Sequence, residues 1–170
     1  MVREISSGGV VLREISGVWH VALIEPQKES PARSKTPRKR TKAILALPKG
    51  LVDPGEEPQD TAVREVREET GISAEVLTKL ADIKYVYVRT WGDGERVFKI
   101  VSFYLLRYSS GEIDEIASDM RIEVKRALWV PLAEASRQLA YSNERKVLRL
   151  ARDYLESHGT VTHALAENPE

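Results

Sequence analysis

Three glutamates near the middle of the chain have a spacing that could bind a metal ion. Glu65, Glu68 and Glu69 occupy positions i, i+3 and i+4, and on a helix this puts three carboxylates on one face. Like charges so placed destabilise an isolated helix by roughly 0.2–0.5 kcal/mol per pair, which favours a bound cation as the reason for keeping them together. Carboxylate oxygens suit hard divalent cations, so the predicted ion is Mg²⁺ or Mn²⁺.

The same spacing has a plainer interpretation. Acidic helix faces are commonly solvated and carry ion pairs between residues four apart, and Arg64 could pair with Glu68 in this way. The flanking residues favour the metal site instead. A loop with Gly50 and Gly55 precedes the glutamates, and Gly71 follows them at the position where many helices end.

Gly50, Glu56 and residues 64–72 (REVREETGI) together resemble the Nudix box, whose elements are glycine, five residues, glutamate, seven residues and a glutamate-rich helix. Every required position of that pattern is met in this sequence. The resemblance implies a divalent-metal-dependent hydrolase of nucleoside diphosphates linked to another group. It also implies an α/β fold, a Nudix-like α/β/α sandwich around a mixed β-sheet.

The resemblance implies roles for particular residues of the box. The residues expected to hold one to three ions are Glu65, Glu68 and Glu69. Glu56 is expected to add a ligand or to orient Arg64, and the main-chain carbonyl of Lys49 is a further possible ligand. Arg64 would fix the glutamates through charge-assisted hydrogen bonds, with a surface pair to Glu68 as its alternative.

The general base is expected to be Glu123 or Glu68, and the expected catalytic set is completed by Glu69 and Arg64. Glu123 shortly precedes a predicted strand over residues 126–130, at a position resembling one where relatives keep a functional glutamate. The competing interpretation of Glu123 is an exposed loop acid, which is the usual environment of glutamate.

Several segments outside the box resemble the bacterial diadenosine tetraphosphate hydrolase branch of the family. They are residues 47–50, 83–87, 96–99 and 141–148. This resemblance implies that water attacks one phosphate and releases ATP and AMP. The residues expected to contact phosphates are Lys49, Arg96 and Lys99, and those expected to stack on adenine are Tyr85, Tyr87 and Tyr141. For each tyrosine the alternative is a half-buried sheet or helix residue, and Lys99 could simply lie on a solvated strand face.

Other functions stay open at this point. A second hypothesis is a hydrolase of oxidised nucleoside triphosphates, inositol pyrophosphates or RNA 5′ pyrophosphate. A third is a regulator that binds a nucleotide without turning it over. The complete set of glutamates argues against this third hypothesis, because a binding module has no need of so many like charges together.

A basic tract interrupts the pattern of strands at residues 26–42. It contains seven lysine and arginine residues and one acid, Glu29, and it has no apolar periodicity. We predict a long mobile loop, which could attract a polyphosphate or RNA or could be a tolerated insertion without a role. No aromatic residue lies among the charges to stack on bases, so binding of nucleic acid through this loop is not the favoured interpretation.

The remaining composition bounds the class of protein. The chain has 170 residues, a formal net charge of zero and no cysteine, which gives no disulfide framework, no thiolate zinc site and no general attraction to nucleic acid or anionic membranes. We expect one domain over residues 1–157 and a flexible tail over 158–170. No apolar run approaches the length of a membrane span, so a cytoplasmic location is expected, while the oligomeric state is left open.

Hydrophobic periodicity predicts alternating strands and helices. The predicted strands cover residues 7–12, 18–24, 43–47, 74–80, 83–90, 97–106 and 126–130. The predicted helices cover residues 58–70, a region that begins at 131, and residues 143–157. In the first helix, Ala62, Val66 and Thr70 are expected to face the core and leave the glutamates on another face.

Overall fold

A six-stranded mixed sheet forms the centre of the fold in the computed structural model, which describes residues 1–27, 43–90, 92 and 94–158. The strands are β1 (Val2–Ile15), β2 (Val18–Pro26), β3 (Lys49–Leu51), β4 (Ser73–Val88), β5 (Arg96–Ser110) and β6 (Val124–Pro131). The helices are α1 (Pro58–Thr70), the 3₁₀ helix η2 (Ser118–Ile122), α2 (Leu132–Gln138) and α3 (Ser142–Ser157).

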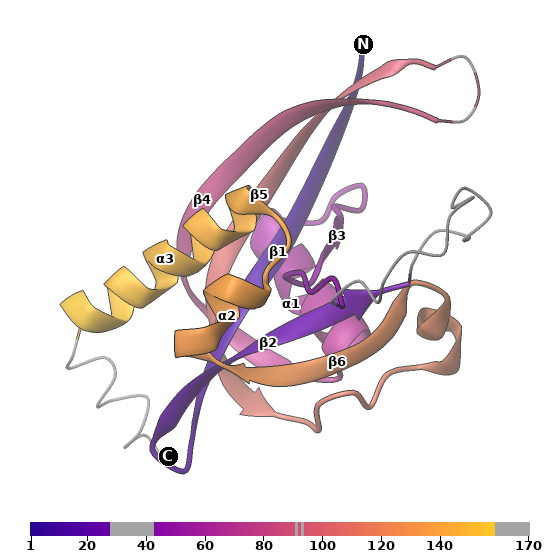
Figure 1. Cartoon of the computed structure of the whole chain (residues 1–170). Coiled ribbons are helices and arrows are strands. Elements are labelled where there is room, and N and C mark those ends of the chain that lie inside the picture. The colour runs from indigo at the N-terminus through magenta and orange to yellow at the C-terminus, as the bar shows by residue number, and fades with distance from the viewer. Residues whose placement is uncertain (28–42, 91, 93, 159–170) are drawn as a thin grey trace, which may run out of the picture.

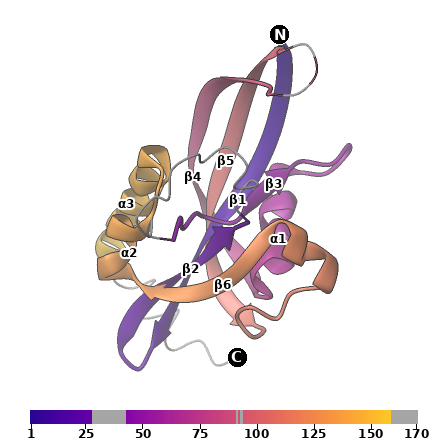
Figure 2. The same cartoon turned by 45° about the vertical axis from the view of Figure 1, so that its right-hand side comes forward.

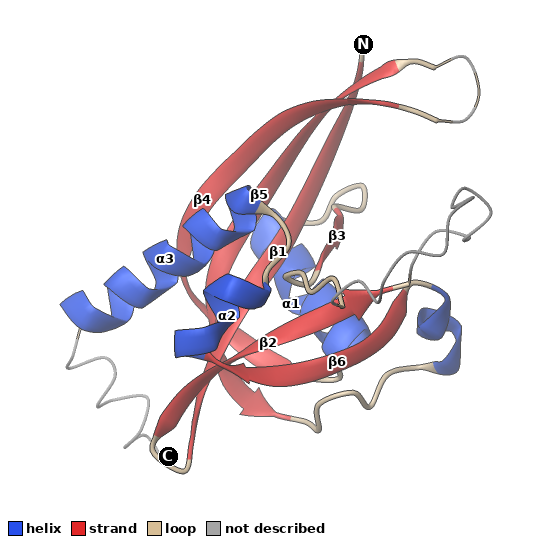
Figure 3. Ribbon diagram, in the orientation of Figure 1, coloured by secondary structure: helices blue, strands red, loops and turns tan. Residues whose placement is uncertain are grey.

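The strand order is β4-β5-β1-β2-β6, and β3 pairs separately with β1. β1 and β5 run parallel, while the other pairs are antiparallel. The predicted hairpin of residues 7–12 and 18–24 is confirmed, because β1 and β2 pair antiparallel with Leu12 opposite Val21. The prediction of a mixed α/β fold is confirmed as well (Figure 3).

The sheet is covered by helices on both faces, with α1 on one side and α2 and α3 on the other (Figures 1 and 2). The alternation of side chains along β5 produces this arrangement. Val101, Phe103 and Leu105 pack in the core cluster that includes α2 and α3. Tyr104 and Leu106 pack in the cluster that includes α1. Each fully buried aliphatic side chain contributes roughly 1.5–3 kcal/mol, so both layers stabilise the sheet that carries the site.

Helix α1 begins and ends where the sequence predicts. Pro58 lies in its first turn, and Gly71 ends it in the left-handed conformation with a φ of 83°. Ala62, Val66 and Thr70 are all fully buried, which confirms the predicted core face. The helix therefore keeps a fixed rotation about its axis, and its glutamates are held on the side that faces β3.

Two strand predictions are wrong. Residues 43–47 form only isolated bridges, between Ile24 and Ala46 and between Leu45 and Leu139, because they pass between β2 and the end of α2 without a long partner. Residues 74–80 and 83–88 belong to one strand, β4, which pairs with β5 along its whole length, and residues 89 and 90 lie beyond its end. Register shifts between Val76 and Thr78 and nearby interrupt the alternation, which is why the sequence pattern suggested a break.

The predicted basic loop and tail lie almost entirely outside the described residues. Pro26 still belongs to β2, so that strand reaches one residue into the range predicted as loop. His158 is the only described residue of the predicted tail, and its N–H donates to the carbonyl of Tyr154. Among the described helices, none has the length and apolar character needed to cross a bilayer.

Candidate functional site

The acidic residues are positioned by a strand, a loop and a helix that follow one another in the sequence. β3 pairs with β1, with Gly50 opposite Ser7. In the following loop the N–H of Glu56 donates to the carbonyl of Asp53 at 3.0 Å, and α1 starts two residues after Glu56. This tight turn sets the direction of the helix and therefore the direction of its carboxylates.

Arg64 lies at the centre of the acidic group. Its Nε and Nη2 donate to the two carboxylate oxygens of Glu56, both at 2.9 Å, and its Nη1 donates to Glu65 at 2.9 Å and to Glu68 at 3.2 Å. Hydrogen bonds from Arg64 and from the Thr61 hydroxyl lower the pKa of Glu56 to about 2. The guanidinium therefore holds three glutamates at once, and its contact with Glu68 is only one part of its interactions.

Glu65 lies against the main chain of Gly50. A Cβ atom at position 50 would come within 2.1 Å of Cδ and 2.2 Å of Oε1 of Glu65, so only glycine leaves room for this carboxylate. Glu65 is 8% exposed. Its burial raises its pKa, and the negative charge of Glu68 raises it further.

Glu69 is the most buried of the three helix glutamates and faces the residue before Gly50. Its Oε1 accepts the main-chain N–H of Lys49 at 2.8 Å. Burial raises the pKa of Glu69 to about 8 despite the hydrogen bond from Lys49, and the nearby charges of Glu65 and Glu123 add to the rise. A buried carboxyl group with a strongly raised pKa next to further acidic side chains is a candidate functional residue.

Glu123 belongs to a distant part of the sequence but lies near the same acidic group. It is exposed directly after η2 and before β6, and its charge contributes to the raised pKa of both Glu65 and Glu69. Glu68 has a side chain that is 39% exposed, with its oxygens near Arg64. Both candidate bases thus remain accessible to solvent at the edge of the acidic group.

The described residues contain no set of three acidic or imidazole side chains that already converge as a metal site. Oxygens of Glu65 and Glu68 face Arg64, and an oxygen of Glu69 faces Lys49. The chemistry of the group still fits a hard divalent ion. A carboxylate that accepts one hydrogen bond keeps further lone pairs, and oxygen ligands of this kind suit Mg²⁺ or Mn²⁺. Burial raises the pKa of Glu65 and of Glu69, and the charges of neighbouring glutamates raise them further.

A cavity of about 300 Å³ lies on the other side of Lys49. It is lined by Lys49, Ile83, Tyr85, Val101, Phe103, Tyr141, Asn143 and Glu144. Three of the predicted substrate-binding residues, Lys49, Tyr85 and Tyr141, are therefore brought together here. The Lys49 ammonium lies 5.6 Å from the ring centroid of Tyr141, within the range of a cation–π interaction.

Tyr87 and Lys99 lie on the same sheet face, next to this cavity. The hydroxyl of Tyr87 donates to Glu4 at 2.9 Å, and the Lys99 ammonium lies 3.9 Å from the same carboxylate. Burial lowers the pKa of Lys99, and the positive charge of Lys49 lowers it further, so the two ammonium groups are within electrostatic reach. The structure places Tyr87 beside Glu4 rather than in the lining of the cavity.

Arg96, another predicted phosphate contact, lies apart from Lys99 on the sheet. It pairs with Val88 at the far end of the β4–β5 ladder, while Lys99 pairs with Tyr85. Successive residues of a strand point to opposite faces, so Arg96 and Lys99, three residues apart in a regular stretch, lie on opposite faces. A role of Arg96 in phosphate binding stays a prediction, which the resemblance of residues 96–99 to the diadenosine tetraphosphate hydrolase branch implied.

A comparison with known families decides the identity of this fold and site. The family described as NUDIX domain matches residues 16–151. The chain belongs to the Nudix family. Members of this family generally depend on a divalent metal, in agreement with the acidic group on α1.

Individual relatives of this Nudix chain carry different names. A protein of Mycobacterium tuberculosis, "Putative mutator protein MutT4", is 37% identical over 91% of this chain and 57% of its own length. A protein of Mycolicibacterium smegmatis, "8-oxo-(d)GTP phosphatase", is 32% identical over 61% of this chain and 29% of its own length. The chain thus spans just over half of the first relative and less than a third of the second.

A solved structure agrees with the Nudix fold. The crystal structure of a C. elegans Ap4A hydrolase binary complex matches with a TM-score of 0.63 and 23% identity, over 91% of this chain and 98% of that chain. At this level of identity the similarity concerns the arrangement of strands and helices.

Sequence reasoning missed several residues of the Nudix chain that line the cavity. Ile83, Val101 and Phe103 read as ordinary strand residues, since apolar residues of a strand usually belong to the core. Glu144 reads as an acid in the first turn of a helix, which is a common stabilising position. Ile83 and Glu144 lie in segments that resemble the diadenosine tetraphosphate hydrolase branch, but nothing in the sequence marked them individually, because the packing of α3 against the sheet brings the lining residues together.

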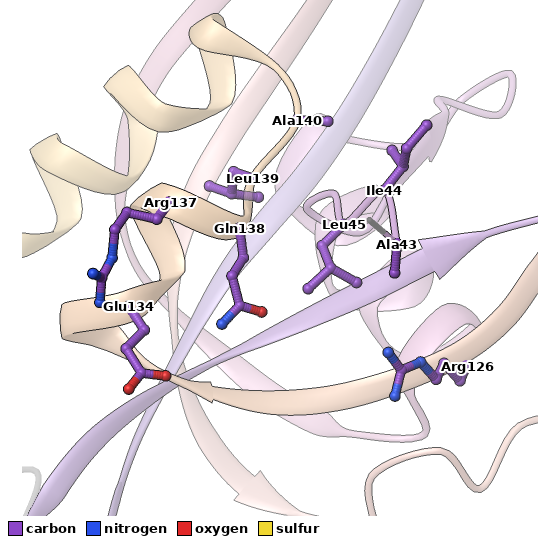
Figure 4. Close-up of a pocket in the computed structure, with 9 residues that line it drawn as sticks. All are labelled: Ala43, Ile44, Leu45, Arg126, Glu134, Arg137, Gln138, Leu139 and Ala140. Carbon is purple, nitrogen blue, oxygen red and sulfur yellow. The ribbon is translucent and has the colours of Figure 1, made fainter. Parts of the chain in front are cut away.

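A second cavity of this Nudix chain lies apart from both groups (Figure 4). It lies between the segment 43–45 and the end of α2, and Arg126 reaches its rim from β6 (Figure 4). None of the predicted site residues lines it. The acidic group and the cavity next to Lys49 are therefore the better candidates for function.

Proposed function

We propose that this chain is a divalent-metal-dependent hydrolase that cleaves a phosphoanhydride bond of a nucleoside polyphosphate. Diadenosine tetraphosphate is the substrate we favour, with ATP and AMP as products. One observation carries the proposal: a buried acidic group and a tyrosine-lined cavity meet at Lys49. The main-chain N–H of Lys49 bonds Glu69, and its ammonium lines the cavity.

Glu65, Glu68 and Glu69 are the residues that would hold Mg²⁺ or Mn²⁺, with Glu56 and the Lys49 carbonyl as further candidate ligands. The bound ion would neutralise phosphate charge and polarise the bond that is attacked. Arg64 serves this group by fixing the directions of Glu56, Glu65 and Glu68. Its contribution is positional, because its guanidinium is already saturated by these glutamates.

A carboxylate at the edge of the acidic group would accept the proton of the attacking water. Water oxygen forms a bond to phosphorus, the bond from that phosphorus to its bridging oxygen breaks, and the bridging oxygen leaves with the larger nucleotide. Glu123 and Glu68 are the candidates for the base, since both are accessible to solvent beside the buried glutamates.

Recognition of the substrate would use the opposite side of Lys49. The ammonium groups of Lys49 and Lys99 suit the negative oxygens of a polyphosphate chain. Tyr85 and Tyr141 offer ring faces to an adenine in the cavity. Tyr87 would act on this surface through Glu4, which it bonds together with Lys99.

A second candidate function is hydrolysis of oxidised nucleoside triphosphates, which the name of the Mycolicibacterium relative suggests. The two functions predict different products. Incubation with Mg²⁺ followed by chromatography should yield ATP and AMP from diadenosine tetraphosphate. Preferential release of pyrophosphate from 8-oxo-dGTP would support the second candidate, and binding without any product would support a regulator.

A further inference from the structure

Glu144 is buried, charged and turned away from the helix that carries it. It is 3% exposed and lies in the first turn of α3. Its Oε1 accepts the main-chain N–H of Leu47 at 2.8 Å, and its Oε2 accepts the Lys49 ammonium at 3.1 Å. A glutamate that served only the helix would face the helix's own first amides, whereas these hydrogen bonds run to the segment before Gly50.

The segment 47–49 is thereby held from two sides. Glu144 bonds the N–H of Leu47, and Glu69 bonds the N–H of Lys49. The carbonyl of Pro48, between them, accepts the N–H of Gly9 from β1 at 3.2 Å. Lys49 therefore has its main chain fixed against the acidic group and its side chain fixed at the cavity by different carboxylates.

We propose that Glu144 is a positioning residue that holds Lys49 between the cavity and the acidic group, so that a substrate bound in the cavity meets an ammonium already in place. This inference rests on the proposed function. A lysine side chain that is free to rotate loses conformational freedom when it binds a phosphate, and a lysine held by a buried carboxylate has lost that freedom beforehand. Glu144 thus acts through Lys49 and does not itself touch the reacting atoms.

The alternative is that Glu144 merely stabilises the chain by accepting the N–H of Leu47. The variant Glu144→Gln separates the two roles, since a glutamine has nearly the same size and still offers an oxygen to Leu47. It loses the negative charge that holds the Lys49 ammonium. Lys49→Met removes the ammonium, and the double variant completes a double-mutant cycle. If Glu144 acts through Lys49, the effect of Glu144→Gln should vanish once Lys49 has been replaced.

The measurement is steady-state hydrolysis of diadenosine tetraphosphate with Mg²⁺ for wild type, both single variants and the double variant. We expect Glu144→Gln to raise KM about 10-fold and to change kcat less than about 3-fold, because binding rather than chemistry is affected. In the Lys49→Met background the same substitution should change KM less than about 2-fold. Glu134→Gln, an exposed acid in the first turn of α2, is the matched control and should change neither constant.

Two results would overturn the proposal while leaving the proposed function intact. One is an equal increase of KM for Glu144→Gln with and without Lys49, which would mark a purely structural role. The other is a fall in kcat at unchanged KM. A wild-type protein that hydrolyses neither diadenosine tetraphosphate nor a nucleoside triphosphate with Mg²⁺ or Mn²⁺ would overturn the proposed function, and this inference with it.

Discussion

On the α1 side of the sheet the candidate functional residues are acidic and come from one short stretch of chain, whereas on the α3 side they are aromatic, apolar and basic and come from distant elements. The acidic group is supplied mainly by residues 50–69, with Glu123 as its one distant member. The cavity is lined from β3, β4, β5 and the start of α3. The acidic group thus depends on the spacing of residues along one stretch of sequence, while the cavity proposed to bind the substrate depends on tertiary packing.

The largest expected effect is a loss of turnover when Glu69, on the α1 side of the sheet, is replaced. Glu69→Gln keeps an oxygen for the Lys49 N–H, so the segment before Gly50 should stay in place while the charge is lost. We expect kcat to fall about 10²-fold or more and KM to change only a few fold, as for removal of a charge-stabilising catalytic contact. Kinetics with Mg²⁺ and diadenosine tetraphosphate test this expectation.

Asp60→Asn is the control for that variant, because Asp60 is an exposed acid in the first turn of the same helix. It should retain wild-type kcat. Equal losses in both variants would mean that the general charge of α1 matters and that the buried position of Glu69 does not.

The second prediction tests how the acidic side is built. Gly50→Ala puts a Cβ where the Glu65 carboxylate lies, and Glu65 must then leave its contact with Arg64. The structure records no positive φ for Gly50, so steric displacement of Glu65 is the main consequence. We expect affinity for Mn²⁺, measured by calorimetry, to fall about 10–100-fold, as when the support of a metal ligand is lost.

Leu51→Ala serves as the control for Gly50→Ala. Leu51 is the neighbouring residue of β3 and is 55% exposed, so its truncation should leave Mn²⁺ affinity unchanged. Normal Mn²⁺ affinity in Gly50→Ala would contradict the close contact between Gly50 and Glu65.

The third prediction concerns the cavity alone. Tyr141 is 50% exposed and lies beside the Lys49 ammonium, so Tyr141→Leu should leave folding intact while it removes a ring face for adenine. Stacking of a base on an aromatic ring is worth about 1–3 kcal/mol, which corresponds to a rise in KM of roughly 5–100-fold at nearly constant kcat. Tyr141→Phe keeps the ring and should behave as wild type. A fall in kcat for Tyr141→Leu, or equal effects of both variants, would contradict the assignment of substrate binding to the cavity and of catalysis to the acidic group.

The success of sequence reasoning follows the same division. The acidic group was predictable because its spacing is local: Gly50, Glu56, Arg64 and the glutamates after it are fixed by one turn and one helix. Helix α1 was predictable for the same reason, with Pro58 at its start and Gly71 at its end. Each of these features depends on neighbours within a few residues, which the sequence displays directly.

The failures involve contacts between distant residues. The resemblance implied a phosphate contact for both Arg96 and Lys99, and the sequence did not show that strand alternation would place them on opposite faces. The two strands predicted at residues 74–80 and 83–90 form one strand, β4, because its long partner β5 pairs with it through the bulges of β4. Glu144 resembled an ordinary helix acid, since its partners Leu47 and Lys49 are almost a hundred residues away.

The smallest expected effect concerns the pH dependence of folding stability on the α1 side of the sheet. Asp114 braces the end of α1: its N–H donates to the carbonyl of Thr70, and its carboxylate accepts bonds from Arg121 and from the N–H of Ala127. The bond from Arg121 is the largest influence on the pKa of Asp114, which lies below its ordinary value. An unfolded aspartate has a pKa of about 3.9, so this stabilisation is present above that pH and is lost as the pH falls through the lower folded pKa.

Asp114→Asn should therefore be less stable than wild type at pH 7, and the difference should shrink as the pH falls below about 3.9. Asparagine also tolerates the left-handed backbone at this position, where φ is 72°, so the substitution removes charge without adding strain. Because Asp114 is partly exposed, we expect a loss of about 1 kcal/mol in the free energy of unfolding. Urea unfolding followed by circular dichroism at pH 7, 5 and 3 measures it, with Asp119→Asn, an exposed acid of η2, as the control. A difference that persists unchanged at pH 3 would show that packing of Asp114, and not its charge, holds the end of α1.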